Sequence, residues 1–252
     1  MRFTYLIYLL YILLFFNCKQ PKAYLTQIDG KQIPVEESVS PDSEIEAFIK
    51  PYRTHIQKDL DNVLAYSKAT YTKSDGEFNT ALGNYMADAV FDEANPIFKS
   101  RTGKNIDMVI LNHGGIRSII SKGNITTRTA FELMPFENSI MVVALKSPQI
   151  DSLINYLSKA RKAHPISKLK LAIDKDFNVI EATVNDEEID SNRTYFVATN
   201  DYLYNGGDGM TFFKPNEAVF ILDYKIRNAL IDNFKKVDTI NPVRDDRFIM
   251  IQ

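Results

Sequence analysis

The chain has 252 residues, of which 45% are hydrophobic and 12% aromatic. This length and composition suffice for one large domain or two small ones with a proper core, and they exclude a disordered protein. With 30 basic and 32 acidic residues the charge is nearly balanced, which argues against a nucleic acid or an anionic membrane surface as the partner. Any specificity must therefore come from local sites.

The first 18 residues have the layout of a secretion signal. Arg2 is followed by a nearly unbroken apolar stretch that ends at Cys18, the only cysteine. This stretch falls short of the roughly 20 residues that span a bilayer, although an uncleaved anchor stays open. Cys18 stands where a bacterial lipoprotein signal would be cut, and a chance cysteine is the alternative. We expect a lipoprotein-type signal peptide over 1–18 and an exported protein, anchored to the membrane through Cys18, in the periplasm or at the cell surface of a bacterium.

Two segments lead into the body of the chain. Residues 19–41 are predicted to be a tether with an edge strand, because two short β-like pieces, 23–28 and 31–35, lie among polar residues and proline. A helix is predicted over 42–66 from apolar residues at helical spacing, interrupted at Pro51. Residues 42–252 then form a single domain.

Strands and helices follow in irregular order. The predicted strands cover 69–74, 106–112, 139–147, 168–173, 178–184, 194–200 and 246–250, with a hairpin turn at 186–190. The predicted helices cover 79–94, 126–134, 148–163 and 221–238. Because there is no strict βαβ repeat, this order predicts an α+β, or mixed α/β, fold with a mixed sheet flanked by helices.

The first candidate site is the stretch NHGGIR, residues 112–117, directly behind the predicted strand 106–112. Gly114 and Gly115 let the backbone approach a ligand, because neither has a Cβ. Arg117 offers a planar charged fork for carboxylate or phosphate oxygens. The stretch fits an anion site and a simple tight turn equally well.

The second candidate is NDYLYNGGDGM, residues 200–210, behind the predicted strand 194–200. Its tyrosines could form a plate for a flat ring, and Asp208 could bind sugar hydroxyls. An ordinary glycine-rich hairpin turn is the alternative. A third stretch, MPFENS, places Phe136 on a turn, where an aromatic ring can stack on a ligand or simply cover the core.

In this order, the segments 82–90, 112–117, 123–138 and 199–210 resemble the C-terminal substrate-recognition domain of the secreted 5'-nucleotidase family. The resemblance implies a nucleoside pocket in which Phe136 and Tyr202 sandwich the base. It implies that Asn112 contacts the base, that Asp208 holds the ribose hydroxyls and that Arg117 lies on the phosphate side. The implied substrate-binding set is completed by Asn138, which also faces the base, and by Gly114, Gly115 and Asn205.

The chain departs from the family pattern in two places. Relatives carry further arginines and a glutamate before the LGN motif, where this chain has Lys73 and Glu77. The three histidines of the chain do not form the metal-binding motifs of the family's metallophosphoesterase domain. His55 and His164 are expected at the surface, and His113 is expected to be a bystander in the glycine loop. We therefore expect no cofactor in this chain, and divalent metals in a partner.

The resemblance implies a nucleoside- or nucleotide-recognition domain of a 5'-nucleotidase-type phosphoric ester hydrolase. We expect it to act with a separately encoded metallophosphoesterase in extracytoplasmic nucleotide catabolism, and to hydrolyse nothing alone. Two alternatives stay open. One is a non-catalytic nucleoside-binding surface lipoprotein, and the other is a degenerate domain kept for protein contacts.

Overall fold

The computed structural model describes residues 24–251, so the predicted signal peptide and Cys18 lie outside the described residues. The chain divides into two units, residues 1–49 and 50–252. In the first unit, residues 24–42 form no strand, so the predicted edge strand is wrong. These residues are exposed.

Helix α2 spans Ser43–Leu60 and begins where Asp42 Oδ1 accepts hydrogen bonds from the amides of Glu44 and Ile45, at 2.9 and 3.0 Å. It continues through Pro51, so the proline does not split the helix in two. It also ends earlier than predicted, because residues 63–67 pair as a strand. No residue of α2 is buried.

A five-stranded mixed sheet forms the centre of the second unit, in the order β10-β4-β9-β2-β5. Its strands β2 and β9 are parallel, and the other neighbouring pairs are antiparallel. The strands are β2 Met108–Ile110, β4 Ser139–Lys146, β5 Ile166–Ser167, β9 Thr194–Asn200 and β10 Ala218–Lys225. The predicted mixed sheet flanked by helices is thereby confirmed.

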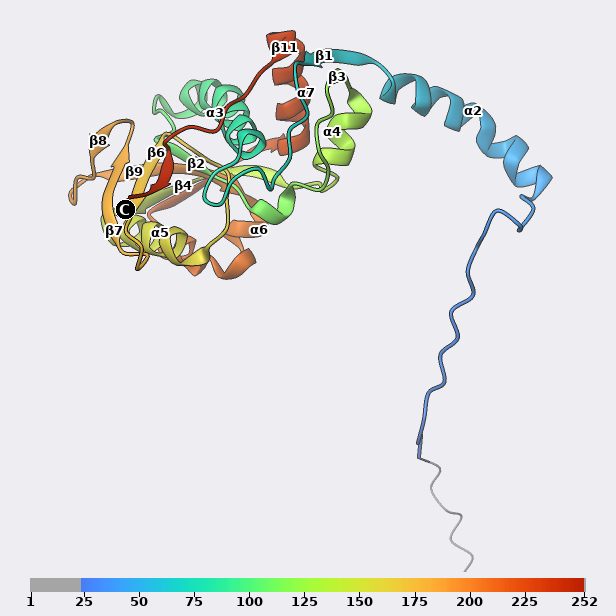
Figure 1. Ribbon diagram of the computed structural model, residues 1–252, viewed down its shortest axis with the longest axis horizontal. Coiled ribbons are helices and arrows are strands. Elements are labelled where there is room, and N and C mark those ends of the chain that lie inside the picture. Colours follow the sequence, from blue (N-terminus) through green and yellow to red (C-terminus); the bar gives the residue numbers. More distant parts are fainter. Residues whose placement is uncertain (1–23, 252) are drawn as a thin grey trace, which may run out of the picture. The chain divides into compact units, whose positions relative to one another are not determined.

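Both faces of this sheet are covered, as Figure 1 shows with α3 and α7 on one side of the strands and α5 on the other. The cause is visible in β2, where Val109 packs in one core cluster while Met108 and Ile110 pack in the other. The first cluster contains buried residues of α3 and α7, and the second those of α5. These helices are α3 Ala81–Thr102, α5 Ser147–Ala160 and α7 Ile226–Val237.

Two smaller sheets and two short helices complete the unit. One sheet has the order β11-β1-β3, and the other β12-β6-β7-β8. Their strands are β1 Val63–Ser67, β3 Gly123–Thr126, β6 Leu169–Ile173, β7 Val179–Val184, β8 Glu187–Glu188, β11 Thr239–Ile240 and β12 Phe248–Met250. The short helices are α4 Thr127–Leu133 and α6 Asp201–Tyr204.

Three predicted elements beyond residue 66 need correction. Residues 221–225 belong to β10 and not to the closing helix, because Ile221 pairs with Met141 of β4 and this tertiary pairing overrides the helical spacing. The predicted turn 186–190 contains β8, which pairs back on β7. The predicted strand 69–74 is reduced to one bridge, between Tyr71 and Ile120.

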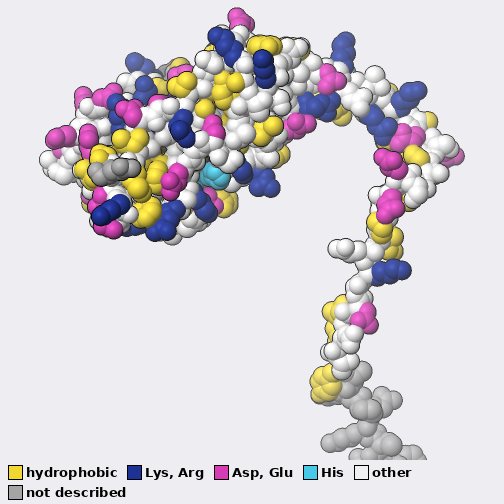
Figure 2. Space-filling view, viewed as in Figure 1, with side chains coloured by type: hydrophobic (Ala, Val, Ile, Leu, Met, Phe, Trp, Pro, Cys, Tyr) yellow, Lys and Arg dark blue, Asp and Glu magenta, His cyan; other side chains and the backbone are white. Residues whose placement is uncertain are grey.

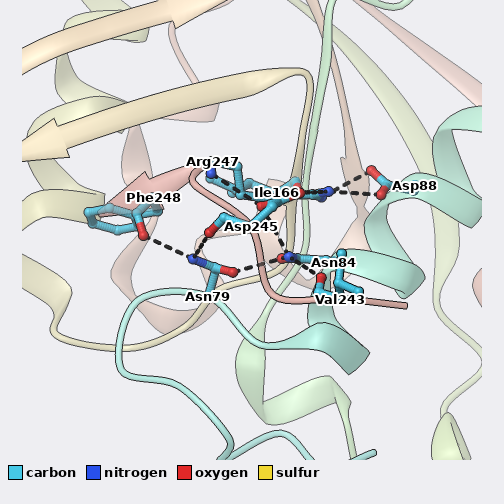
Figure 3. A network of polar contacts seen from close by, with 8 residues as sticks. All are labelled: Asn79, Asn84, Asp88, Ile166, Val243, Asp245, Arg247 and Phe248. Carbon is cyan, nitrogen blue, oxygen red and sulfur yellow. Dashed lines mark hydrogen bonds and ion pairs between the residues drawn. The ribbon is translucent and has the colours of Figure 1, made fainter. Parts of the chain in front are cut away.

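The C-terminal segment is held against α3 by a polar network that we call the C-terminal clamp, drawn in Figure 3. Buried Asn79 donates to the carbonyls of Asp245 and Phe248, at 3.1 and 2.9 Å. Buried Asn84 donates to the Val243 carbonyl at 3.2 Å. In the same network, Arg247 contacts Asp88 at 3.0 and 2.9 Å, Asp245 at 2.8 Å and the Ile166 carbonyl at 2.7 Å.

Candidate functional site

The candidate site lies at the end of the central sheet that is formed by the carboxyl ends of the parallel strands β2 and β9. Met108 of β2 lies opposite Val197 of β9, so the residues that follow the two strands come together. Asn200 Nδ2 donates to Asn112 Oδ1 at 2.9 Å. The Asn200 Oδ1 accepts from the amide of Leu203 at 2.8 Å and so caps α6. One fully buried asparagine therefore joins the first two candidate stretches.

The NHGGIR stretch forms a 3-10 turn over His113–Gly115. A Cβ on Gly115 would lie 3.0 Å from Asn112 Oδ1, so the turn packs closely over the asparagine side chain, and a larger residue there would have to displace it slightly. Gly114 is exposed. The Arg117 amide donates to the Leu133 carbonyl at 2.9 Å, which fixes the end of the turn against α4 while the Arg117 side chain stays exposed.

Phe136 lies on the turn between α4 and β4, and its side chain is 42% exposed. The guanidinium carbon of Arg117 is 5.8 Å from the centre of its ring. The structure thus brings together the cation and one of the two aromatic rings named from the sequence. Phe136 is partly buried and partly exposed, so its ring is accessible to a ligand while it also covers part of the surface beneath it.

The Phe136 turn adjoins the start of α6. Strands β4 and β9 are antiparallel with Ile140 opposite Asn200, so the beginning of β4 lies beside the end of β9. Across this junction Asn138 Nδ2 donates to Asp201 Oδ1 at 2.7 Å. The same carboxylate oxygen accepts from the amide of Tyr202 at 2.9 Å. The turns that carry Phe136 and Tyr202 are therefore joined by one carboxylate.

Tyr202 is 45% exposed, and its hydroxyl donates to Asp208 Oδ1 at 2.9 Å. A Cβ on Gly207 would lie 2.4 Å from the tyrosine ring, so the ring rests directly on the glycine backbone. Asp208 itself has a positive φ of 53°, a conformation that aspartate tolerates better than most residues. Asn205 accepts from Lys214 Nζ at 3.1 Å. Residues 200–210 form α6 and a 3-10 turn, so the hairpin alternative is wrong.

Two residues behind this edge were not expected there. The Tyr156 hydroxyl donates to the Asp208 carbonyl at 2.8 Å, and burial together with the nearby Asp208 carboxylate raises the pKa of Tyr156. His164 was expected at the surface but is 2% exposed, because it lies just before β5, whose Ile166 pairs with Ile110 of β2. Its Nδ1 lies 3.3 Å from the Leu111 carbonyl, and burial lowers its pKa to about 4.

Other residues at the site were also missed by the sequence reading. Asn200 and Asp201 carried an available signal, because an asparagine directly before a short amphipathic stretch is a typical N-cap. Arg227 carried none. It donates to the Phe136 turn from about ninety positions further along the chain.

Lys73 and Glu77 lie on the loop before α3. The Lys73 ammonium donates to the Ile116 carbonyl at 2.9 Å, one residue before Arg117. Glu77 is exposed. Lys73 is therefore joined to the backbone of the NHGGIR stretch.

The site is open and is not a deep cavity. Figure 2 shows basic and acidic side chains interspersed over one face of the folded unit. A hollow of about 390 Å³ does exist, but it contains no candidate residue and borders the C-terminal clamp through Asp88, Asp245 and Arg247. The two half-exposed rings, Phe136 and Tyr202, lie outside this hollow.

The described residues do not fit a metal centre. Over residues 24–251 no three histidine, cysteine, aspartate or glutamate side chains gather where they could hold an ion. No metal-dependent step is therefore assigned to this part of the chain. Within the same range no helix is both long and apolar enough to cross a membrane.

The fold and the loops at its sheet edge define a mixed α/β domain with its polar and aromatic loops gathered at one end of the central sheet. A model of the family described as 5'-nucleotidase, C-terminal domain, matches residues 60–215. The chain belongs to this family. The predicted resemblance is thereby confirmed.

Curated relatives agree with this assignment. The chain is 26% identical over 223 residues to the cell wall protein Lmo0130 of Listeria monocytogenes, covering 79% of this chain and 28% of the relative. It is 32% identical over 164 residues to the trifunctional nucleotide phosphoesterase protein YfkN of Bacillus subtilis, covering 58% of this chain and 11% of the relative. The chain thus spans less than a third of these relatives.

A solved structure has the same fold. The 5'-nucleotidase precursor of Thermus thermophilus superposes with a TM-score of 0.68 and 23% identity, over 84% of this chain and 44% of that one. At this identity the likeness concerns the fold.

Proposed function

We propose that this chain recognises the nucleoside part of a nucleotide for a 5'-nucleotidase-type hydrolase, with hydrolysis carried out by a separately encoded metallophosphoesterase that binds divalent metals. The observation that carries the proposal is the pair of half-exposed rings, Phe136 and Tyr202, on turns joined through Asn138 and Asp201. Family membership supports the same function.

The base would stack between the two rings, which accept any flat heterocycle through their π faces. Asn112 Oδ1 is engaged by Asn200, so the Asn112 Nδ2 is the group to donate to a base acceptor. The Asn138 Nδ2 is likewise engaged by Asp201, which leaves the side-chain Oδ1 of Asn138 for a base donor. These amides give the stacked base an orientation.

The sugar and phosphate would extend from the stacked base. Asp208 offers its second carboxylate oxygen to the ribose hydroxyls, because the first accepts from Tyr202. Arg117 lies over the Phe136 ring and has an exposed guanidinium for phosphate oxygens. The Lys73 ammonium, bound to the carbonyl of the preceding residue Ile116, adds positive charge. The chain's own role is thus to bind and orient the nucleotide.

We also propose that the protein acts outside the cytoplasm, anchored by a lipid on Cys18. A relative named as a cell wall protein supports an extracytoplasmic location. The nucleotide phosphoesterase among the relatives supports a role in nucleotide catabolism.

Calorimetry with adenosine and AMP tests the binding half of the proposal. We expect both to bind, and AMP to bind more tightly because of the charge of Arg117 and Lys73. A protein that binds neither would contradict the function.

Phosphate release from AMP tests the other half. We expect none from the purified chain with divalent metal, and release once a metallophosphoesterase from the same organism is added. Robust hydrolysis by the chain alone would contradict the division of labour. Binding with no effect on the added enzyme would favour the non-catalytic surface lipoprotein instead.

A further inference from the structure

The turn that carries Phe136 is held from one side by the start of α7. Five successive backbone carbonyls, those of residues 134–138, accept hydrogen bonds from only three residues, 225–227. Lys225 Nζ takes the Glu137 carbonyl at 2.7 Å, and the Ile226 amide takes the Asn138 carbonyl at 3.1 Å. The remaining three carbonyls accept from Arg227. Figure 1 shows α4, which precedes this turn, beside α7.

Arg227 contacts three backbone carbonyls, a carboxylate and an aromatic ring. Its Nη1 lies 3.4, 3.2 and 3.4 Å from the carbonyl oxygens of Met134, Pro135 and Phe136, respectively. Its Nη2 forms an ion pair with Glu137. The guanidinium carbon also lies 4.1 Å from the centre of the Phe131 ring on α4.

The burial of this side chain is costly. Arg227 is 5% exposed, its Nε has no hydrogen-bond partner, and its carboxylate partner Glu137 is largely in solvent. A solvent-exposed carboxylate offsets little of the desolvation cost of the buried Arg227 guanidinium, so the ion pair alone does not explain the burial. What the burial achieves is a guanidinium whose Nη1 faces three consecutive carbonyls while its Nη2 pairs with Glu137, and the compact ammonium of lysine has no second arm for the carboxylate.

The consequence concerns Phe136. The carbonyls of its turn are directed at residues 225–227, which hold the turn from one side, yet the ring at its tip stays 42% exposed. An exposed ring that is held in place loses little conformational entropy when a base stacks on it.

We propose that Arg227 is the positioning residue for the stacking ring Phe136, and that it sets the affinity for the nucleoside base without touching the ligand. This inference rests on the proposed function, in which Phe136 stacks on the base.

A double-mutant cycle on adenosine affinity tests the inference. We expect Phe136→Ala to weaken binding about ten- to a hundredfold, which is the usual range for one stacked base. Arg227→Met is expected to weaken binding about tenfold in the wild-type background and not at all beside Phe136→Ala. Beside Tyr202→Ala it keeps its full effect.

The controls separate positioning from general loss of structure. Arg128 on α4 pairs with Asp61 at 2.8 Å and does not contact the turn, so Arg128→Met is expected to leave affinity unchanged. If Arg227→Met fails to fold, the exposed partner supplies a milder variant. Glu137→Ala is expected to weaken adenosine binding a few-fold, again only when Phe136 is present.

A spectroscopic measurement reports the order of the turn directly. The chain contains no tryptophan, so Phe136→Trp introduces a single reporter at the ring position. We expect its fluorescence anisotropy to fall when Arg227→Met is added, and to stay constant with Arg128→Met.

The outcomes distinguish the two proposals. Equal losses from Arg227→Met with and without Phe136, together with unchanged anisotropy, would overturn the positioning role while leaving nucleoside binding intact. A wild-type protein that does not bind adenosine would instead overturn the proposed function, and the anisotropy would still decide whether Arg227 orders the turn.

Discussion

The C-terminal clamp and the candidate site are both polar networks that contain buried asparagines, and they leave very different surfaces. In the clamp, Asn79 and Asn84 are directed at carbonyls of the returning chain, and Arg247 joins two carboxylates. At the site, Asn200 is buried in the same way, but the network ends at turns whose rings remain exposed.

This difference separates the candidate site from the clamp. The clamp lies beside a hollow of about 390 Å³, yet its side chains are occupied with one another and with the backbone. The site has no comparable hollow, yet it presents two aromatic rings and unengaged amide and carboxylate oxygens. The groups that a network leaves exposed are thus better evidence of binding than the network or the space beside it.

The largest effect is expected in the clamp and concerns stability alone. Arg247→Met leaves Asp88 and Asp245 without their cation and removes the hydrogen bond to the Ile166 carbonyl. Because these carboxylates are partly exposed, we expect a loss of about 3 kcal/mol in the free energy of unfolding, at the low end for a broken buried pair. Urea denaturation measures this loss, and adenosine affinity should not change below the transition.

Exposed Arg244, which donates to the Asp75 carbonyl at 2.7 Å, provides the matched control. We expect Arg244→Met to cost less than about 1 kcal/mol. A large loss of affinity in the folded Arg247 variant would show that the clamp and the site are coupled, against the comparison drawn above.

His164 adds a pH dependence behind the site. Burial lowers its pKa to about 4, while the unfolded chain takes up the proton near the ordinary value of 6.5. The unfolded state therefore binds more protons between these values. Near pH 7 His164 is neutral in both states and does not change the free energy of unfolding. As the pH falls through 6.5 toward 4, the free energy of unfolding decreases by up to about 3 kcal/mol.

Denaturation of wild type and His164→Gln between pH 4 and 8 measures this term. We expect the difference in unfolding free energy between the two proteins to shrink or reverse as the pH falls. A pH-independent difference for His164→Gln would contradict a buried neutral imidazole.

Gly207→Ala perturbs one ring without touching its chemistry. The new Cβ would lie 2.4 Å from the Tyr202 ring, so the ring must move away from the backbone on which it rests. We expect adenosine affinity to fall about tenfold, which a displaced stacking partner would cause. Calorimetry on Gly207→Ala combined with Tyr202→Ala should show no further loss beyond Tyr202→Ala alone, and additive losses would argue against this route.

The smallest effect is expected from Tyr202→Phe, which keeps the ring and removes the hydroxyl that holds Asp208. Because this hydrogen bond is exposed, we expect affinity for adenosine to fall only a few-fold. Affinity for 2'-deoxyadenosine should fall less, since Asp208 is assigned to the ribose hydroxyls. Equal losses for both nucleosides would remove Asp208 from that role.

Much of the fold follows from local pattern. Apolar spacing located α3, α5 and the strands β2, β4, β6, β7 and β9, because burial on one or two faces leaves its period in the sequence. Residues 221–225 were misread because their apolar residues also fit a helix, and only pairing with β4 decides between the two. Long-range pairing has no local signal.

The site divides in the same way. The glycines and aromatics of residues 112–117 and 200–210 were identifiable because they interrupt the apolar pattern at strand ends. The burial of His164 and the reach of Arg227 were not, since both depend on which distant segments pack together. The supporting residues of this site are thus harder to predict than the groups they present.

The central claim is that Phe136 and Tyr202 together stack on a nucleoside base. Its most direct test is calorimetric titration of adenosine into the wild type, the two single alanine variants and the Phe136→Ala/Tyr202→Ala double variant. We predict measurable binding by the wild type, weakening of about tenfold or more in each single variant, and no detectable binding by the double variant. Adenosine binding of equal affinity in all four proteins would contradict the claim.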